Sequence, residues 1–244
     1  MKRFIETFQN IWRIEELKQR ILTTLGLVLI YRLGSYVVLP GIDTEVLTAA
    51  NANANDGGII ALINAFAGGA FSRASIFGLG IMPYITASII IQLLGMAVPY
   101  FQKMQKEGES GRKKINQYTR FLTIAVTAVQ APGYLAAQVY SKPGVVAIDP
   151  AWFGIQATLI LVAGTMFIMW LGERITDKGI GNGISVLIMI GIISRLPFAI
   201  TSEFGSRLQS AGGGLIMFLL EIVFLLFIIV SCILLVQGTR RIPV

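Results

Sequence analysis

The sequence predicts an all-α membrane protein with about six transmembrane helices, an N-terminal amphipathic helix and a re-entrant half-helix. Hydrophobic residues make up 55% of the 244-residue chain and charged residues only 14%. Soluble domains carry charge on about a quarter of their residues, so this composition cannot cover a water-exposed globule. The hydrophobic residues also gather in long runs, which is the second sign of a chain that spans a membrane.

Six of these runs are long enough to cross, or nearly cross, a hydrocarbon core about 30 Å thick as helices. They cover residues 21–39, 75–99, 119–139, 153–171, 183–198 and 214–236. The fifth run is short and rich in glycine, so its ends are the least defined. The connection between the first two runs is too long for a tight turn, and it becomes apolar toward its end.

Residues 1–20 precede the first run and have a different pattern. Hydrophobic side chains recur there at helical spacing, with charged residues on the other side, at Phe4, Phe8, Ile11 and Trp12. This pattern is typical of an amphipathic helix on a membrane surface. A cleaved signal peptide is the alternative, but no small-residue cleavage site follows the apolar run.

The positions of lysine and arginine predict the orientation. These residues concentrate in four stretches, which are 1–20, 102–120, 172–182 and the C-terminal end. The positive-inside rule places all four in the cytoplasm, so both ends of the chain are expected there. An even number of spans requires the same arrangement and is an independent argument for it.

Catalytic and metal-binding patterns were not found in the sequence. The chain has no histidine and one cysteine, Cys232, and its aspartates all fall in connections between the runs. The glycine-rich stretch 179–183 follows a predicted helix and lacks the lysine of a P-loop, so it reads as a tight turn. We therefore expect no enzymatic activity, no cofactor and no metal.

Three ionisable residues, Arg32, Arg195 and Glu221, lie within or near the outer ends of predicted spans. A charge in this position is a functional-site hypothesis by default, because its desolvation is costly unless it is paired or reaches water. Long arginine side chains near helix ends also snorkel to the interface. Snorkelling and structural pairing both remain open for the arginines, and the role of Glu221 is open.

Three further features need an interpretation beyond spanning the membrane. The run "GGIIALINAFAGGAFSR" is about half the length of a span and leads directly into the second span, which is the pattern of a re-entrant element that lines or blocks a cavity. In that span, Ile81, Ile85 and Ile89 form one stripe, which spacing alone assigns to lipid contact or helix packing. The basic 102–120 connection is either a solvated loop or a docking surface for a soluble partner or anionic lipid.

Two long motifs resemble the signatures of the SecY/Sec61α family of protein-conducting channels. The first is "SIFGLGIMPYITASIIIQLL" at residues 75–94, and the second is "WLGERITDKGIGNGISVLI" at residues 170–188, which includes Glu173. The stretches "RLGSYVVLPGID", "KEGESGRKKINQYTR" and "RRIPV" are also similar to the family, so the resemblance covers nearly the whole chain and is of the bacterial type.

The resemblance implies an hourglass-shaped pore with an apolar ring at its waist. The ring positions match Ile81, Ile85 and Ile188. A plug that seals the closed pore matches residues 57–72, and the second and third spans match one side of a lateral gate. The plug residues are Gly57, Gly58, Ile59, Ile60, Ala61, Leu62, Ile63, Asn64, Ala65, Phe66, Ala67, Gly68, Gly69, Ala70, Phe71 and Ser72.

The resemblance also implies partners and a location. Family members work with SecE, SecG, the SecA motor or the ribosome, signal sequences, unfolded preproteins and membrane lipid, with no nucleic acid except through the ribosome. The location implied is the bacterial inner membrane. Basic residues expected to contact cytoplasmic partners are Lys103, Lys106, Arg112, Lys113, Lys114, Arg240 and Arg241.

Family members have ten spans in two halves, and the resemblance places this chain in the N-terminal half. We therefore expect residues 1–244 alone not to form a working pore. The alternative function is a secondary transporter of a small solute, because broken helices and half-repeats occur there too. Polar ligands at the midplane favour the transporter, whereas an isoleucine stripe favours the channel.

Overall fold

The computed structural model describes residues 13–53, 59–209 and 214–238, which form two compact units. The first unit covers residues 1–194 and the second covers residues 195–244. Within the described ranges every regular element is a helix, and extended pairing is limited to the isolated bridges Val38↔Ser75 and Ile42↔Val146. The predicted all-α class is confirmed.

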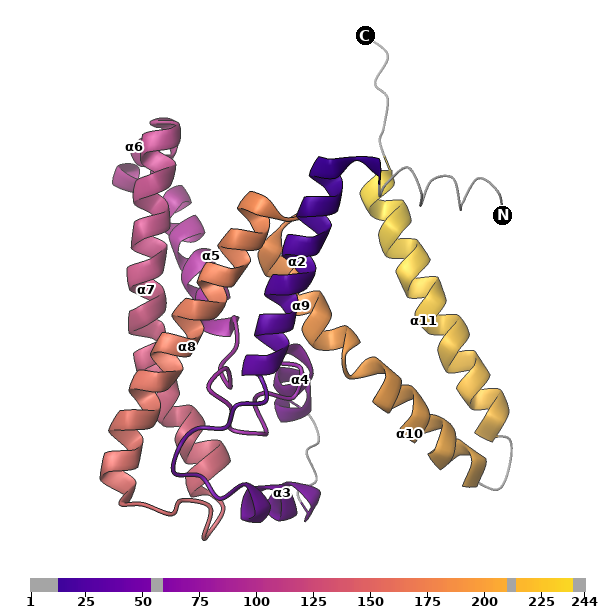
Figure 1. The fold of residues 1–244 in the computed structure, drawn as a ribbon. Helices are drawn as coiled ribbons and strands as arrows, with labels where there is room; N and C mark the ends of the chain where they lie inside the picture. The colour runs from indigo at the N-terminus through magenta and orange to yellow at the C-terminus, as the bar shows by residue number, and fades with distance from the viewer. Residues whose placement is uncertain (1–12, 54–58, 210–213, 239–244) are drawn as a thin grey trace. The chain divides into compact units, whose positions relative to one another are not determined.

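The helices follow one another through most of the chain (Figure 1). Those of the first unit are α2 (Glu15–Gly34), α3 (Thr44–Asn53), α4 (Ile59–Phe66), α5 (Met82–Ala97), α6 (Pro99–Lys106), α7 (Glu109–Leu135), the π-helix η1 (Ala136–Tyr140), α8 (Pro150–Lys178) and α9 (Gly183–Ile193). The second unit contains α10 (Leu196–Gln209) and α11 (Gly214–Gln237).

Side-chain caps fix where the two helices of the second signature begin. At α8, the Asp149 carboxylate accepts hydrogen bonds from the backbone N–H groups of Ala151 and Trp152, and Pro150 occupies the first turn, where a missing N–H costs nothing. At α9, the Asn182 side chain accepts from the N–H groups of Ile184 and Ser185. The "GIGNG" stretch is thus the turn between α8 and α9, as its sequence predicts.

Proline lies at two irregular points of the helices. The second span was expected over 75–99, but residues 76–81 form turns and α5 begins at Met82, with Pro83 in its first turn. In α7, Pro132 lies inside the helix and the π-helical turn η1 follows it. Proline lacks the N–H that an interior helical position donates, so the hydrogen-bond ladder is rearranged nearby.

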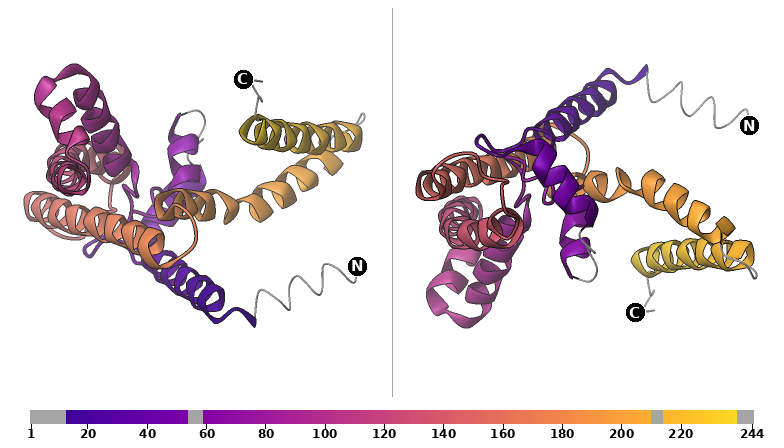
Figure 2. Two further views of the ribbon diagram at one scale, coloured as in Figure 1. Left: turned by 90° about the horizontal axis from the view of Figure 1, so that it is seen from above. Right: turned by 90° about the horizontal axis from the view of Figure 1, so that it is seen from below.

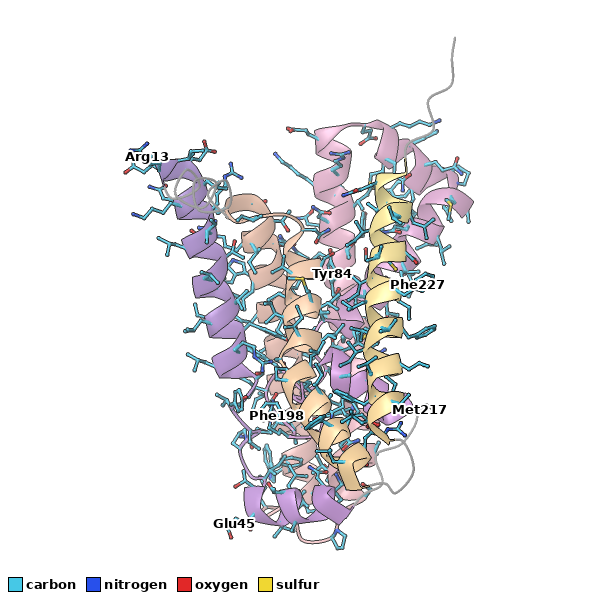
Figure 3. All side chains as sticks on the ribbon, turned by 90° about the vertical axis from the view of Figure 1, so that its right-hand side faces the viewer. Arg13, Glu45, Tyr84, Phe198, Met217 and Phe227 are labelled. Carbon is cyan, nitrogen blue, oxygen red and sulfur yellow. The ribbon has the colours of Figure 1, made fainter. Side chains whose placement is uncertain are left out.

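The first unit is organised around α8, which packs against α7 on one side and α2 on another (Figure 2). Phe153, Leu161 and Ile168 of α8 are fully buried there. Figure 3 shows Arg13, just before α2, and Glu45, in α3, at opposite ends of the unit. The helix α2 therefore runs through most of its depth, and α3 lies at one end.

The first helix differs from the expected boundary between an amphipathic helix over 1–20 and a span over 21–39. Residues 15–20 belong to the same helix as the first apolar run, and this helix ends at Gly34 rather than at residue 39. Residues 1–12, which carry the four predicted apolar side chains, lie outside the described residues. The interfacial helix therefore stays a prediction.

The second unit is a helical hairpin of α10 and α11. Phe204 and Phe218 pack edge to face between the two helices, with ring centroids 5.3 Å apart. None of the described residues of α11 is buried within this chain. Met217 and Phe227, which are 52% and 65% exposed, project from the helix in Figure 3. An apolar helix with this exposure requires a nonpolar surrounding such as lipid or other helices.

Length and composition support several membrane crossings. Among the described residues, four helical stretches are long and apolar enough to span: Glu109–Tyr140, Pro150–Lys178, Gly183–Leu208 and Gly214–Gln237. The pair α5 and α6, bent by 99° at Val98, raises the number to five if it counts as one span. The helix α2 is not among them. The chain is a multi-pass membrane protein, and the exact count of six stays a prediction.

Candidate functional site

The structure brings Ile81, Ile85 and Ile188 together on the wall of one cavity of about 220 Å³. The lining is almost entirely apolar. Its residues are Tyr31, Phe66, Ala67, Leu79, Gly80, Ile81, Met82, Ile85, Ile168, Leu187 and Ile188. The two family signatures, far apart in the sequence, therefore meet at this cavity.

Local helix geometry gives the three isoleucines their positions. Ile81 immediately precedes α5, and its carbonyl oxygen accepts the backbone N–H of Ile85 at 3.1 Å, so the two residues lie one turn apart. Ile188 lies in α9, whose start is fixed by the Asn182 cap. Ile89, the third member of the stripe, is 50% exposed and does not line the cavity. The stripe is therefore divided between cavity and surface.

The helices α8 and α9 approach each other closely at two glycines, and this approach positions Ile188. A Cβ on Gly183 would lie 2.0 Å from the carbonyl oxygen of Gly172, which is far inside contact distance. Gly78 has a similar role next to α7, because a Cβ there would lie 2.5 Å from the Tyr134 hydroxyl. Close packing at small residues is the expected means of helix association in a membrane.

The segment predicted to be the plug contributes two residues to the cavity wall. Phe66, the last residue of α4, and Ala67 both line it. The backbone of Phe66 lies against α9, since a Cβ on Gly191 would come within 2.7 Å of the Phe66 carbonyl oxygen. Gly57 and Gly58 fall outside the described residues, so only the part from Ile59 onward is placed.

The plug segment turns back sharply after α4. Gly68 and Gly69 have φ values of +60° and +86°, which favour glycine. Across this turn, the side-chain oxygen of Asn64 accepts hydrogen bonds from the backbone N–H of Ser72 at 3.2 Å and from its hydroxyl at 3.0 Å. Asn64 therefore ties α4 to the end of the plug segment.

Two arginines lie beside this turn. The guanidinium of Arg73 lies over the Tyr36 ring, 4.3 Å from its centroid, and donates a hydrogen bond to the Gly68 carbonyl oxygen at 3.1 Å. The Arg32 guanidinium lies 5.9 Å from the same ring centroid. Aromatic rings stabilise cations at these distances. Arg32 thus has a structural contact, which is one of the two interpretations left open by the sequence.

A second, polar pocket of about 330 Å³ lies between α5, α7, α8 and α9. Within it the Arg120 guanidinium donates two hydrogen bonds to the Glu173 carboxylate, at 3.3 Å and 2.6 Å. Tyr84 also lines this pocket. Sequence reasoning did not pair Arg120 with Glu173, because nothing local relates positions 53 residues apart.

The basic connection is helical rather than a loop. It contains α6 and the start of α7, which are joined at Gly108 with a φ of +70°. Its predicted partner-contact residues are all exposed: Lys103, Lys106, Arg112, Lys113 and Lys114. Arg240 and Arg241 lie outside the described residues. A docking surface stays a prediction, since exposure alone does not separate it from a solvated face.

Glu221, the open case among the charges in spans, has a partner within the second unit. Its carboxylate accepts a hydrogen bond of 2.6 Å from Arg207 on α10, and Arg207 also contacts Glu203 at 2.8 Å. Glu221 on α11 is therefore paired with Arg207 of α10, which it shares with Glu203. The remaining charge, Arg195, lies between α9 and α10 and begins the second unit.

Comparison with known proteins decides the family. The family model described as SecY matches residues 75–244, which is more than half of the chain. The chain belongs to the SecY family. Similar curated proteins include the protein translocase subunits SecY of Buchnera aphidicola (subsp. Schizaphis graminum), 44% identical over 96% of this chain, and of Escherichia coli (strain K12), 46% identical over 94%.

The chain spans about half the length of these SecY relatives, 53% and 52% respectively. Two solved structures share its fold. Sec61 in the canine ribosome-channel complex from the endoplasmic reticulum has a TM-score of 0.62 at 20% identity and covers 93% of this chain and 49% of its own. The structure of a protein conducting channel has a TM-score of 0.57 at 20% identity and covers 79% and 42%.

Proposed function

We propose that this chain is the N-terminal half of the pore-forming subunit of a SecY-type protein-conducting channel. The complete channel passes unfolded preproteins across the membrane and releases signal sequences and membrane segments sideways into lipid. The observation that carries this proposal is the apolar cavity at which Ile81, Ile85 and Ile188 meet beside the end of α4.

The chemistry of the cavity suits a seal around a moving polypeptide. Isoleucine side chains offer no ligand to an ion, and an apolar constriction excludes ions by dewetting. Ile81, Ile85 and Ile188 would form part of the ring, and the second half of the channel would supply the rest. Phe66 and Ala67 of the plug segment would close the ring from one side when no chain is present.

The secondary transporter remains the alternative and is less well supported. A transporter binds its solute near the membrane midplane with helix ends, carbonyl groups and polar side chains. The cavity lining contains one polar side chain, that of Tyr31, among the residues that form it. This composition favours a seal over a solute site.

Other roles follow from the same proposal. The packed pair α5 and α7 would form one wall of the lateral gate. The exposed basic residues of α6 and of the start of α7 would meet SecA, the ribosome or anionic lipid, and SecE and SecG would complete the channel. The protein itself would catalyse no reaction, and the motor or chain elongation on the ribosome would supply the energy. It would reside in the bacterial inner membrane, with both ends of this chain in the cytoplasm.

Ion conductance of the complete channel in planar bilayers tests the ring. The double change Ile81→Gly and Ile85→Gly is expected to raise the resting conductance severalfold, because it removes apolar side chains from the cavity wall. Ile89→Gly is the matched control, since Ile89 lies on the same stripe but is 50% exposed and does not line the cavity.

Crosslinking tests the passage of a polypeptide directly. A photoreactive amino acid at position 81 or 188 is expected to crosslink to a preprotein arrested in the channel, whereas one at position 89 is not. An unchanged conductance in the double variant, together with no crosslink from position 81 or 188, would overturn the proposal.

A further inference from the structure

The end of the plug segment is held by two helices that are distant in the sequence. The Tyr134 hydroxyl on α7 donates a hydrogen bond of 2.7 Å to the Phe71 carbonyl oxygen, and the Asn51 amide on α3 donates one of 2.8 Å to the Ser72 carbonyl oxygen. Two consecutive carbonyl groups are thus bound from two different directions.

Tyr134 is buried in the core of the first unit. Its side chain is only 5% exposed, and its ring packs edge to face on Phe71 with the centroids 4.8 Å apart. The absence of a side chain at Gly78 leaves space for its hydroxyl. A buried hydroxyl without a hydrogen-bond partner is costly, so the Tyr134 hydroxyl is expected to keep its hydrogen bond to Phe71.

Asn51 is itself held in place. The Lys142 ammonium donates to the Asn51 side-chain oxygen, which leaves the amide nitrogen directed at Ser72. Lys142 also donates to Gln138 at 3.4 Å. This chain of contacts connects the end of η1, through α3, to the plug segment.

The residues after Ser72 are fixed by the backbone. Leu39 donates its N–H to the Ala74 carbonyl oxygen, and Ile76 donates to Val37, both at 2.9 Å. Ala70 and Ala74 are 1% and 0% exposed in the core that contains Tyr134. The chain from Ala70 onward is therefore part of the rigid scaffold of the first unit.

The residues before Gly68 are attached differently. Ala67 belongs to the same buried core as Ala70 but also lines the cavity. The helix α4 is joined to the anchored part through the Asn64–Ser72 hydrogen bonds, the turn at Gly68 and Gly69, and the Arg73 hydrogen bond to Gly68. Both glycines adopt positive φ, where a chain without Cβ atoms changes conformation at low cost. The boundary between a movable part and a fixed part therefore lies at this glycine pair.

We propose that Tyr134 and Asn51 are positioning residues that hold the C-terminal end of the plug, so that only the α4 part leaves the cavity when the channel opens, turning about Gly68 and Gly69. This inference rests on the proposed channel function. It assigns separate roles within the plug: Tyr134 and Asn51 anchor its end, and Asn64 is the latch that breaks on opening.

The test compares two buried alanines on either side of the glycine pair. Ala67 and Ala70 are 5% and 1% exposed, and each is changed singly to cysteine in the complete channel after Cys232→Ser removes the one native cysteine of this chain. Labelling by a membrane-impermeant thiol reagent is measured in the resting channel and with a preprotein arrested in it. The expected result is that arrest raises labelling of Ala67→Cys about tenfold and leaves Ala70→Cys unlabelled.

Removal of the anchor tests the positioning residues themselves. Tyr134→Phe keeps the ring and loses only the hydroxyl, and Asn51→Ala removes the second hydrogen bond. Each is expected to make Ala70→Cys reactive during arrest and to raise the resting ion conductance severalfold. Tyr140→Phe is the matched control, because the Tyr140 hydroxyl donates to the Pro150 carbonyl oxygen at 2.9 Å and does not contact the plug segment.

The outcomes separate this inference from the proposed function. Equal labelling of Ala67→Cys and Ala70→Cys in the parent during arrest, with a crosslink from position 81 intact, would overturn the anchor and leave the channel standing. Tyr134→Phe and Asn51→Ala behaving like Tyr140→Phe would do the same. No change at either cysteine, with no crosslink from position 81, would remove the channel function and the anchor together.

Discussion

Gly183→Ala gives the sharpest prediction because the structure fixes its sign and identifies the atoms that must move apart. A Cβ at this position would lie 2.0 Å from the Gly172 carbonyl oxygen, and ordinary contact begins at 3.4 Å. The atom that it meets belongs to the backbone of α8, so no side chain can rotate away. The added Cβ and this oxygen must therefore separate by about 1.4 Å, the difference between these two distances, and α8 and α9 must move apart.

Overpacking of this kind costs about 1–3 kcal/mol of folding free energy. The control is Gly26→Ala in α2, where nothing lies within 4 Å of the added Cβ. Alanine is a better helix former than glycine by about 1 kcal/mol at an open interior position. The two glycine-to-alanine changes are thus expected to have opposite signs, although the chemical change is the same.

The assay is the thermal unfolding midpoint of the purified complete channel in detergent, with ion conductance as a second readout. Gly183→Ala is expected to lower the midpoint and to raise the resting conductance, because α9 carries Ile188 into the cavity wall. Gly26→Ala is expected to leave the conductance unchanged and the midpoint equal or higher. A Gly183→Ala channel as stable as the parent would refute the close approach of α8 and α9.

Three further predictions concern other contacts of the first unit. Asp149→Ala should lower the free energy of unfolding, measured by denaturant titration, by about 1 kcal/mol, because it removes the side-chain cap of α8. Asp149→Ser should keep most of this stability, and an equal loss in the two variants would contradict the capping role. Arg120→Ala should lower the free energy of unfolding by less than about 1 kcal/mol in the same titration, because the Arg120 and Glu173 side chains are 48% and 28% exposed. A larger loss would mean that the complete channel shields this ion pair from water. Gly191→Ala should displace the end of α4, because the added Cβ would lie 2.7 Å from the Phe66 carbonyl oxygen. Bilayer recordings should then show a raised resting conductance, and an unchanged conductance would mean that α4 does not contribute to the seal.

The helix boundaries show which structural features can be predicted from neighbouring residues. The helix α9 begins at Gly183, where the fifth run was predicted to begin, whereas α8 begins at Pro150, three residues before the fourth run. The caps at Asp149 and Asn182 act on backbone groups two or three residues away, and hydrophobicity does not detect them. The start of α5 was placed too early, because residues 76–81 are as apolar as a span but form turns that pack Phe77 on Tyr31 of α2 and Gly78 against Tyr134 of α7. Hydrophobicity measures burial in lipid or protein and does not distinguish a turn inside the protein from a helix.

The amino-acid sequence was enough to predict the membrane class, most of the helices and, through two long motifs, the family resemblance, because composition, hydrophobic runs and local motifs are properties of neighbouring residues. Tertiary packing was needed to show that Ile81 and Ile85 share a cavity wall with Ile188 while Ile89 is exposed. It was also needed to show that Tyr134 binds the Phe71 carbonyl group 63 residues away. Such contacts depend on how closely helices approach and on their rotation about their axes, and both are set by packing across the whole unit.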